Sequence, residues 1–510
     1  MHRTEKQTIS SVDERKKDNQ VDLTRRAIII GGASLLAGSL LGCGSNVSQI
    51  TGNLYQGVDG RDYAIQPPTG PAKEISLEAR LTDIEIAPNR IVKAWTYDGK
   101  LPGTEIRVTE GERVRITLRN QLPEETTIHW HGQLQRGTNN MDGVPGVTQT
   151  AIQTNSEFVY DFRAEPAGSF FYHSHKGLQI DRGLIGAFIV EPKQESLKYD
   201  RDYSVLLDDW LEGTPEETLS KLKRGGGGMM GGRGGSGRGM NGSSEIDYQT
   251  YLINGRAPEF PFEFTTKKGE RLRFRVMNPS GSSIYSFAIA GHKLTVTHAD
   301  SLPVKPVEVD TFEIAPGERY DVLVNADNPG VWSVAAIPVG GETSKGGFAL
   351  LKYSDAQGSS LPKANQIPKE LNGRMLKYDQ LISLEPMPQS NAPERSIDIS
   401  LSGGMMSYEW TINGETYPNA KPIEIRAGER IRLNMINRSM MRHPMHLHGH
   451  SYRVLHRNAG NNAPFKDTII VNHMERVEVE FLADNPGDWA FHCHNAYHLD
   501  TGMMRVFKYV

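Results

Sequence analysis

Cysteine is scarce in this chain: its 510 residues include only two, Cys43 and Cys493, which lie far apart. A secreted scaffold held together by disulfides is therefore excluded. An excess of charge of one sign is also lacking, since 57 Lys and Arg residues face 61 Asp and Glu residues, for a net charge of −4. Because this balance gives no electrostatic basis for binding nucleic acid, we predict no nucleic-acid partner.

Glycine and histidine, in contrast, are well represented, with 52 and 16 residues. The hydrophobic fraction is 37%, which together with the glycine content favours a loop-rich β protein. A chain of 510 residues is also too long for one compact core, so we expect several domains.

The N-terminal segment has the pattern of an export signal. Paired arginines, Arg25 and Arg26, precede an apolar run of fifteen residues, 27–41, which is too short to span a bilayer comfortably. The pair resembles a twin-arginine signal, with Ile28 where Phe is usual. The segment ending Leu41-Gly42-Cys43 resembles a bacterial lipobox, so we predict an exported, periplasmic protein with lipid attached at Cys43. An uncleaved anchor, or a cleaved signal with an incidental cysteine, is the alternative.

An internal repeat predicts the architecture. A Gly-Glu-Arg motif begins at Gly111, Gly269 and Gly428, with spacings of 158 and 159 residues. Apolar and charged residues alternate after each motif, which is typical of a half-buried strand, and each stretch continues to an asparagine, namely Asn120, Asn278 and Asn437. Hairpin turns are expected before each copy, at Asp98-Gly99, Asn254-Gly255 and Asn413-Gly414. A Pro-containing turn follows each copy, as in Asn328-Pro329-Gly330 and Asn485-Pro486-Gly487.

These three ordered elements in three copies predict three tandem β-sandwiches. We place a signal at 1–43, a linker at 44–70, the first domain at 71–197, the second at 198–360, a linker at 361–390 and the third at 391–510. A Gly-rich tract at 224–244, which carries Met229, Met230 and Met240, is predicted to be a flexible insertion in the second domain.

Histidines form four His-x-His pairs, at 129/131, 173/175, 446/448 and 492/494. Residues i and i+2 of a strand point to the same face, so the four pairs give eight imidazoles that could enclose one metal cluster. Imidazole suits Cu, Zn, Fe and Ni alike. The second domain lacks such pairs, because the repeat there is predicted to supply Phe287-Ala288-Ile289 and Ser333-Val334-Ala335.

Cys493 narrows the choice of metal. It lies between His492 and His494, so its thiolate points to the opposite face of the strand. There it could meet His443 and His498, with Met503 as a weak axial ligand, which is the donor set of a blue-copper electron-transfer site. One strand would then join two metal sites.

Together these clusters resemble the four copper signatures of the multicopper oxidases, over residues 75–510. The resemblance implies three cupredoxin-like Greek-key domains, in an all-β chain with four coppers that reduces O2 to water. It implies a type 1 copper held by His443, Cys493, His498 and Met503, with Cys493 in electron transfer. It implies a type 2 copper held by His129 and His446, and a binuclear type 3 pair held by His131, His173, His175, His448, His492 and His494. The six other histidines are predicted to be structural: His2, His292, His298, His450, His456 and His473.

Asp142 matches a family carboxylate near the three-copper cluster, which implies a proton relay, with a turn residue before Gly143 as the alternative. The Met440-Met441 pair before His443 resembles bacterial cuprous oxidases and copper-resistance oxidases. This implies oxidation of Cu(I) or phenolic donors in copper tolerance.

The predicted substrate contacts are Met440, Met441 and Asp467, with Met405-Met406 as further candidates and Asp467 equally able to be structural. Ser439 and Leu499 stand where some relatives have acidic residues.

Other functions stay open at this point. The alternative is an exported copper-sequestering lipoprotein whose oxidase activity is incidental and whose Met-bearing insertion binds Cu(I), since thioethers are soft ligands. The same insertion is equally well explained as a solvated linker. A structural cupredoxin repeat is disfavoured by the complete ligand set, and a copper nitrite reductase by the four His-x-His pairs. We expect a monomer.

Overall fold

The computed structural model describes residues 54–64, 67–224, 245–341, 345–354, 360–362, 366–385, 395–404, 407–457 and 460–510. The predicted signal with Cys43, the insertion beyond Arg224 and the Met405-Met406 pair lie outside these residues. In the part of the chain that is described, no helix is long and apolar enough to cross a membrane.

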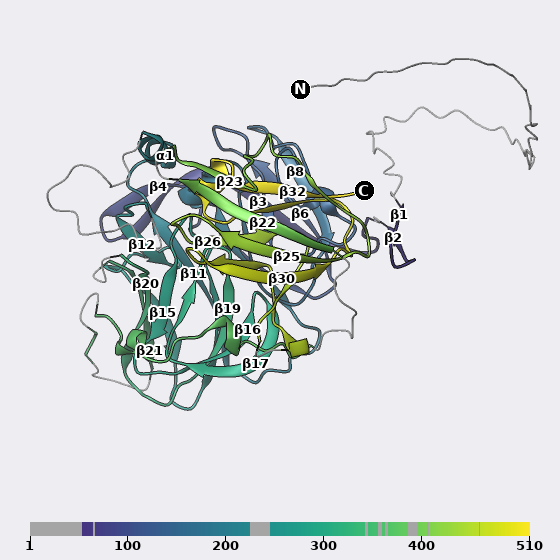
Figure 1. Cartoon of the computed structure of the whole chain (residues 1–510). Coiled ribbons are helices and arrows are strands. Elements are labelled where there is room, and N and C mark those ends of the chain that lie inside the picture. Colours follow the sequence, from purple (N-terminus) through teal and green to yellow (C-terminus); the bar gives the residue numbers. More distant parts are fainter. Residues whose placement is uncertain are drawn as a thin grey trace, which may run out of the picture. The chain divides into compact units, whose positions relative to one another are not determined.

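Two four-stranded sheets form the first repeat, which we call domain 1 (Figure 1). One sheet has the order β4-β3-β6-β8, with β3 and β6 parallel, and the other has the order β5-β10-β9-β7. The strands are β3 (Lys73–Ala87), β4 (Arg90–Tyr97), β5 (Gly103–Thr109), β6 (Arg113–Asn120), β7 (His129–His131), β8 (Glu157–Arg163), β9 (Gly168–His173) and β10 (Ile185–Glu191).

Domain 2 has a six-stranded sheet, β12-β11-β14-β19-β16-β17, and a five-stranded sheet, β13-β21-β20-β15-β18. Its strands are β11 (Arg201–Trp210), β12 (Thr250–Ile253), β13 (Phe262–Thr266), β14 (Arg271–Met277), β15 (Tyr285–Ile289), β16 (Leu294–Ala299), β17 (Leu302–Val309), β18 (Phe312–Ile314), β19 (Arg319–Asn325), β20 (Val331–Pro338) and β21 (Gly347–Tyr353).

Domain 3 repeats this arrangement, with a six-stranded sheet, β23-β22-β25-β30-β27-β28, and a five-stranded sheet, β24-β32-β31-β26-β29. Its strands are β22 (Arg395–Gly404), β23 (Glu409–Ile412), β24 (Ile423–Ile425), β25 (Arg430–Asn437), β26 (His443–Leu447), β27 (Tyr452–Val454), β28 (Phe465–Lys466), β29 (Thr468–Val471), β30 (Arg476–Leu482), β31 (Asp488–Cys493) and β32 (Met504–Tyr509).

The remaining described elements are short. They are the hairpin β1 (Leu54–Gln56) and β2 (Asp62–Ala64), the helices α1 (Pro215–Lys223) and α2 (Ala496–Asp500), and the 3-10 turns η1 (Asn139–Met141), η2 (Gln179–Arg182), η3 (Lys369–Asn372), η4 (Tyr378–Gln380) and η5 (Gly460–Asn462). The all-β fold class predicted from the sequence is therefore confirmed.

The hairpin turn before each repeat has the backbone that its sequence predicts. In domain 2, Asn254 and Gly255 have φ of 50° and 72°, and in domain 3 Asn413 and Gly414 have 55° and 74°. Positive φ at both central residues is the type I′ requirement, which Asn-Gly meets with little strain.

The asparagine at the end of each repeated strand is held by the same kind of contact in all three domains. Its side-chain amide donates to backbone carbonyls, as Asn120 does to Ile152 at 2.9 Å, Asn278 to Ile314 at 2.9 Å and Asn437 to Val471 at 3.1 Å. These bonds fix the end of each repeated strand against a neighbouring segment of its domain.

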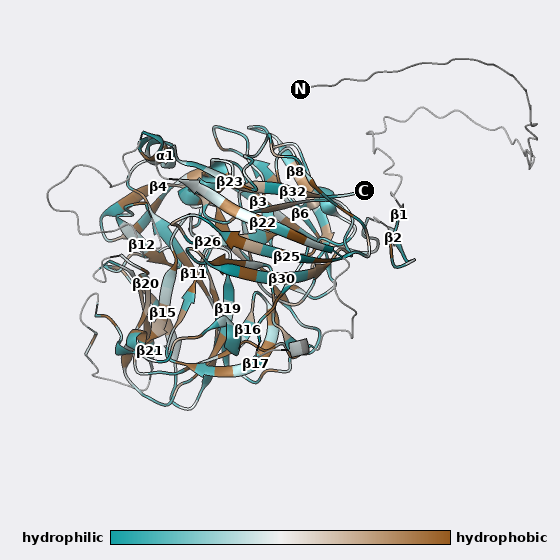
Figure 2. Ribbon diagram, in the orientation of Figure 1, coloured by the Kyte–Doolittle hydropathy of each residue, from teal (hydrophilic) through white to brown (hydrophobic). Residues whose placement is uncertain are grey.

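Alternation along the repeated strands builds the core. In β25, the apolar side chains of Ile431, Leu433 and Met435 are buried, while the intervening charged side chains are partly exposed, and Figure 2 shows this banding. The charged residues face partners on β30, such as Glu480, which accepts from Arg430 at 3.0 Å. The sequence pattern thus fixes which face of each sheet is turned inward.

Candidate metal centre

Strands from domains 1 and 3 bring the four His-x-His pairs together. In domain 1, β7 pairs with β9 so that His129 lies opposite His173. In domain 3, β26 pairs with β31 so that His446 lies opposite His492. Each domain therefore presents two adjacent pairs of imidazoles on one face.

The rings of the two domains meet directly. The Nε2 atom of His492 lies 2.9 Å from that of His448 and 3.3 Å from that of His175. On the other side of the cluster, His494 Nε2 lies 3.2 Å from His131 Nδ1. Eight imidazoles thus surround one small region between the first and last domains, as the spacing predicts.

Hydrogen bonds orient these rings. The Nδ1–H groups of His129, His446 and His492 donate to the backbone oxygens of Asp142, Asp467 and Cys493, at 2.8, 3.0 and 2.9 Å. His173 donates to the oxygen of Ser174 at 2.9 Å in the same way. Donation from one ring nitrogen leaves the other unprotonated and aimed at the cluster.

The cluster fits a metal on the evidence of its unpartnered atoms. The Nε2 atoms of His129, His173 and His446 are buried without a hydrogen-bond partner among the described residues, which is costly unless they bind something. Burial lowers the pKa of most of these imidazoles below the usual value, so they remain neutral and able to donate a lone pair; they are His131, His173, His175, His446, His448, His492 and His494.

Cys493 faces the opposite side of β31. Its Sγ lies 3.5 Å from His498 Nδ1 and 3.7 Å from His443 Nδ1, and those two nitrogens are 3.1 Å apart. Met503 is fully buried, and its backbone oxygen accepts from the Cys493 N–H at 3.1 Å. Burial raises the pKa of the Cys493 thiol, so a cation is needed to hold it as a thiolate. A sulfur between two imidazoles fits copper, with Met503 as the predicted thioether ligand.

Glu245 is a site residue that the sequence analysis missed. Its carboxylate lies 3.2 Å from His498 Nε2 and accepts a hydrogen bond from Tyr408. Ser439 has the corresponding place at the other ring, with its Oγ 2.7 Å from His443 Nε2. Glu245 follows the Gly-rich tract directly, but it belongs to no motif, so only the fold brings it to His498.

Asp142 lies where the family resemblance implies. It is fully buried, and one carboxylate oxygen accepts from His448 Nδ1–H at 2.9 Å. The other oxygen lies 3.2 Å from His129 Nδ1 and has no hydrogen-bond partner in the described residues. Asp142 therefore bridges a ring of domain 1 and a ring of domain 3.

Asp467 does not fit the predicted substrate contact. Its side chain is only 2% exposed, and its Oδ1 lies 3.4 Å from both His131 Nε2 and His446 Nδ1. This position is beside the eight-histidine cluster, where a donor arriving from solvent cannot touch the carboxylate. Of the two methionines predicted to contact substrate, Met441 is 8% exposed and Met440 is 48% exposed, so only Met440 is well exposed.

The structure corrects the repeat alignment in domain 2, by one residue in β15 and by two residues in β20. The ring of Trp332 packs on Gly291 as that of Trp489 packs on Gly449, which sets the equivalent positions. Counted from these anchors, the ligand positions of domain 2 are Ala288, Ala290, Ala335 and Ile337, rather than the residues predicted above. The conclusion that domain 2 supplies no histidine pair is unchanged for the described residues.

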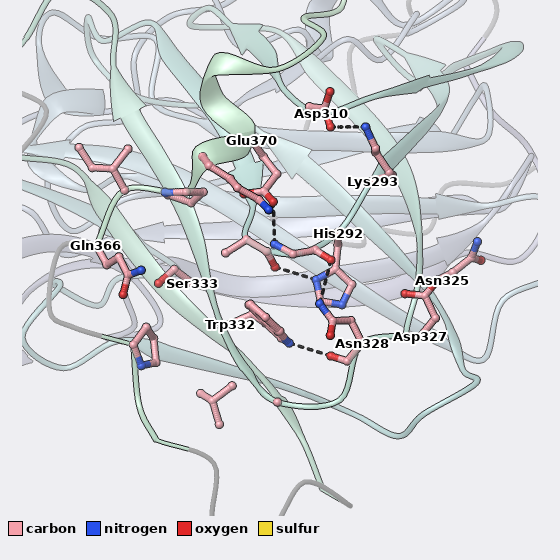
Figure 3. Close-up of a pocket in the computed structure, with 18 of the residues that line it drawn as sticks. His292, Lys293, Asp310, Asn325, Asp327, Asn328, Trp332, Ser333, Gln366 and Glu370 are labelled. Atoms are coloured by element: carbon pink, nitrogen blue, oxygen red, sulfur yellow. Dashed lines mark hydrogen bonds and ion pairs between the residues drawn. The ribbon is translucent and has the colours of Figure 1, made fainter.

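A large pocket lies away from both histidine sites. It has a volume of about 1290 Å³ and is lined by Gly291, His292, Asn328 and Trp332 of domain 2 and by Glu370 of the following linker, among others (Figure 3). None of the predicted copper ligands lines it. Its polar groups are mostly paired with one another, as Trp332 Nε1–H is with the Asn328 oxygen at 2.7 Å.

Five histidines predicted to be structural have ordinary hydrogen-bond partners, and His2 lies outside the described residues. His292 and His450 accept from the hydroxyls of Tyr353 and Tyr509, both at 2.7 Å. The remaining three contact polar groups nearby: His298 contacts Thr297, His456 contacts the Leu381 oxygen and His473 contacts the Ser439 oxygen.

Comparisons with known proteins agree with this arrangement. Residues 78–195, 201–356 and 391–510 each match a family model described as multicopper oxidase. The multicopper oxidase MmcO of Mycobacterium tuberculosis is 35% identical over 459 residues, covering 88% of this chain and 89% of that protein. Copper resistance protein A of Escherichia coli is 30% identical over 544 residues, covering 82% and 89%.

Solved structures share the fold. The structure of Fet3p, described as a multicopper oxidase that functions in iron import, superposes with a TM-score of 0.74 at 20% identity, covering 86% of this chain and 90% of that one. A laccase from Botrytis aclada superposes with a TM-score of 0.73 at 25% identity, covering 87% and 90%.

Proposed function

The chain belongs to the multicopper oxidase family, and on that premise we propose that it couples one-electron oxidation of Cu(I) or phenolic donors to reduction of O2 to water. The observation that carries the proposal is the two-sided strand β31. Cys493 lies 3.5 Å from His498 on one side of this strand, and His492 lies 2.9 Å from His448 on the other. One strand therefore links a site for electron entry to a site for O2.

The predicted residues would hold four coppers. The type 1 ion would be held by His443, Cys493, His498 and Met503, the type 2 ion by His129 and His446, and the type 3 pair by His131, His173, His175, His448, His492 and His494. Bound there, the coppers would supply one-electron redox chemistry, and the reduction of one O2 to two waters takes four electrons and four protons.

Cys493 connects the two sites by covalent and hydrogen bonds. The backbone of β31 joins its sulfur to His492 and His494, and its carbonyl oxygen accepts from the His492 ring at 2.9 Å. The route from sulfur to imidazole is short and lies in the buried core, because Cys493 and His492 are at most 1% exposed. Cys493 thereby carries electrons away from the donor side.

Asp142 is the proposed proton relay. It contacts rings from both domains, and its Oδ1 atom is buried without a hydrogen-bond partner. A carboxylate with a free oxygen beside the cluster can take up a proton and release it there. Leu499 follows His498, so a carboxylate is lacking at that position, which supports assigning the protons to Asp142.

Cu(I) is the proposed first donor. Both type 1 imidazoles, His443 and His498, are fully buried, and their outer nitrogens face Ser439 and Glu245. A bulky phenol therefore has no direct contact with either ring. Met440 offers an exposed thioether, a soft ligand that prefers Cu(I), one residue from Ser439.

A role in copper tolerance follows from this donor. The similarity to copper resistance protein A supports it, as does the removal of Cu(I) that oxidation achieves. The twin-arginine pattern and the lipobox-like Gly42-Cys43 support export to the periplasm with a lipid anchor at Cys43.

The test compares two donors in two variants. In Met440→Leu, kcat/KM for Cu(I) should fall by about tenfold, while kcat/KM for a phenol is unchanged, because only the metal uses the thioether. Met375→Leu, at an exposed methionine of the linker 361–390, is the matched control and should change neither. Equal loss for both donors in Met440→Leu would contradict a Cu(I) contact.

Deletion of residues 225–240 tests the sequestration alternative. If the deletion removes bound Cu(I) while O2 consumption stays constant, the chain is foremost a copper-binding protein. If O2 consumption driven by Cu(I) falls in parallel, the insertion serves the oxidase.

A further inference from the structure

Domain 2 supplies no predicted copper ligand, yet one of its arginines reaches the edge of the eight-histidine cluster. Arg319 begins β19 and is fully buried. Its Nε–H donates to the Ser169 oxygen of domain 1 at 3.2 Å. Its Nη atoms donate to the Gly317 oxygen at 3.0 Å, to Ser301 Oγ at 3.1 Å and to both carboxylate oxygens of Asp467 at 2.6 Å. Arg319 therefore connects all three domains.

Asp467 carries this contact to the histidines. Its Oδ1 accepts from Thr468 at 2.9 Å and lies 3.4 Å from His131 Nε2 and from His446 Nδ1. The rings of His131 and His446 are stacked, with centroids 3.9 Å apart and planes within 19°. One ring comes from domain 1 and the other from domain 3, so Asp467 lies at the seam between the two halves of the cluster.

Two glycines show how closely domain 2 approaches. A Cβ atom on Gly132 would lie 2.5 Å from Arg319 Nη2 and 2.9 Å from Asp467 Oδ2. A Cβ atom on Gly317 would lie 3.0 Å from His494 Cδ2. Both have positive φ, 85° and 91°, which glycine tolerates. At these two glycines the backbone approaches the ion pair and the His494 ring more closely than a side chain would allow.

We propose that Arg319 is a positioning residue of the three-copper cluster, acting through Asp467 on His131 and His446. A bidentate guanidinium fixes both the place and the plane of a carboxylate, which a lysine ammonium cannot do. With Arg319 in place, Asp467 has one orientation, and the two stacked imidazoles are held at a fixed angle. Groups that orient metal ligands in this manner strengthen metal binding and tune it.

A purely structural role for Arg319 would give a different result, and Arg275 provides the matched control. Arg275 is also a buried arginine of domain 2, 1% exposed, and makes a bidentate pair with Asp202. It also touches domain 1, through Ser169 Oγ at 3.0 Å. No contact joins it to Asp467 or to a predicted copper ligand in the described residues.

The experiment uses the copper-loaded full chain with Arg319→Lys and Arg275→Lys. We measure coppers per chain after dialysis against a chelator, the type 2 electron paramagnetic resonance spectrum, the blue type 1 absorption and the unfolding midpoint. In Arg319→Lys, retention of the three-copper cluster should weaken about tenfold and the type 2 spectrum should change, while the blue absorption remains. In Arg275→Lys, the unfolding midpoint should fall. The copper content, the type 2 spectrum and the blue absorption should all stay unchanged.

The proposal is overturned if Arg319→Lys keeps the wild-type type 2 spectrum and copper content and loses only stability, as the control does. If Arg319→Lys fails to fold, Ser301→Ala replaces it, because this change removes the 3.1 Å hydrogen bond that helps to orient the Arg319 guanidinium and leaves the predicted copper ligands in place. An unchanged type 2 spectrum in Ser301→Ala would equally overturn the proposal.

The inference rests on the ligand assignment proposed above, and the two fail differently. A wild-type chain without a type 2 signal would contradict the assignment. A wild-type signal that Arg319→Lys leaves unaltered would contradict only the role of Arg319.

Discussion

Domains 2 and 3 are built on the same local design, and only one of them carries metal ligands. In both, a tryptophan ring packs on a glycine, as Trp332 does on Gly291 and Trp489 on Gly449. In both, the indole N–H donates to an asparagine oxygen at 2.7 Å.

The histidine that follows the glycine is shared as well. His292 and His450 each donate from Nδ1 to the backbone oxygen two residues earlier, at 2.8 and 3.0 Å, and each accepts from a tyrosine hydroxyl. The differences lie at the ligand positions, which are three alanines and an isoleucine in domain 2 and four histidines in domain 3. The scaffold around these positions is thus a property of the fold, and the four substituted side chains decide whether it can contribute to the histidine cluster.

The surroundings of the two Asn-to-Trp turns, Asn328–Trp332 in domain 2 and Asn485–Trp489 in domain 3, also differ. In domain 3, Asn485 Nδ2 donates to the Leu134 oxygen of domain 1 at 2.6 Å, and Asn139 donates to the Asp488 oxygen at 2.8 Å. The corresponding surface of domain 2, beside Asn328 and Trp332, lines the open pocket of Figure 3. This pocket is therefore the domain 2 counterpart of a contact surface that domain 1 covers in domain 3.

The largest expected effect is at Cys493, the position that Ala336 has in domain 2. Cys493→Ser should abolish the blue absorption and all turnover, because oxygen cannot replace the thiolate in that donor set. Ala336→Cys should leave both at wild-type levels without a second blue centre, since the surrounding histidines are lacking. Visible spectra and O2 consumption check both variants, and turnover in Cys493→Ser would refute the electron route.

A pH effect separates domain 2 from the metal sites. Burial lowers the pKa of His298 from 6.5 to about 4, and its side chain is 16% exposed. Between these values the unfolded chain binds a proton that the folded chain does not, so stability falls as the pH falls from 6.5 to 4. His298→Gln should remove up to about 3 kcal/mol of that loss with copper content unchanged. Denaturant unfolding at pH 7 and pH 4.5 measures the change in unfolding free energy between these pH values. An equal change in the wild type and in His298→Gln would contradict the prediction.

Substituting the paired glycines should distinguish scaffold from site. A Cβ on Gly449 would lie 2.5 Å from the Trp489 ring, and one on Gly291 would lie 2.7 Å from Asn328 Nδ2. With positive φ at both positions, each change to alanine should cost about 1–3 kcal/mol of unfolding free energy. Gly449→Ala should also lower the copper content, because Gly449 adjoins His448. Loss of copper in Gly291→Ala would contradict the view that this glycine of domain 2 belongs to the scaffold alone.

The smallest effect is expected at the two tyrosines. Tyr353→Phe and Tyr509→Phe each leave a histidine Nε2 without its 2.7 Å partner, which should cost about 1–2 kcal/mol. Near-equal decreases in the unfolding midpoint of the two variants would show that the Tyr–His hydrogen bond contributes equally to stability in domains 2 and 3. A loss in only one variant would show that the design has diverged.

The parts of the site that the sequence predicted have local signals. Asn254-Gly255 favours a hairpin turn because of the backbone preferences of these two residues. His446 and His448 lie on one face because they are two residues apart on a strand. Cys493 between two histidines likewise fixes its own direction. Each of these conclusions depends on neighbours within a few residues, so no knowledge of the tertiary fold is needed.

The missed parts act over long distances in the sequence. Arg319 meets Asp467 across 148 residues, and Glu245 meets His498 from a segment without a motif. The sequence leaves Asp467 open between a substrate contact and a structural role, and its burial beside Arg319 of domain 2 favours the structural one. The misalignment of domain 2, by one residue in β15 and two in β20, arose because alternating apolar residues fix a strand but leave its register open.

The joint formed by Arg319 also has a consequence for biosynthesis. Arg319 leaves the ribosome 148 residues before Asp467, an interval of about 7–30 s at ordinary rates of translation. During that interval domain 2 can fold, but its inward guanidinium has no carboxylate to bind. The contact among the three domains can form only when nearly the whole chain has been made. The complete cluster is therefore available to metal only near or after the end of synthesis.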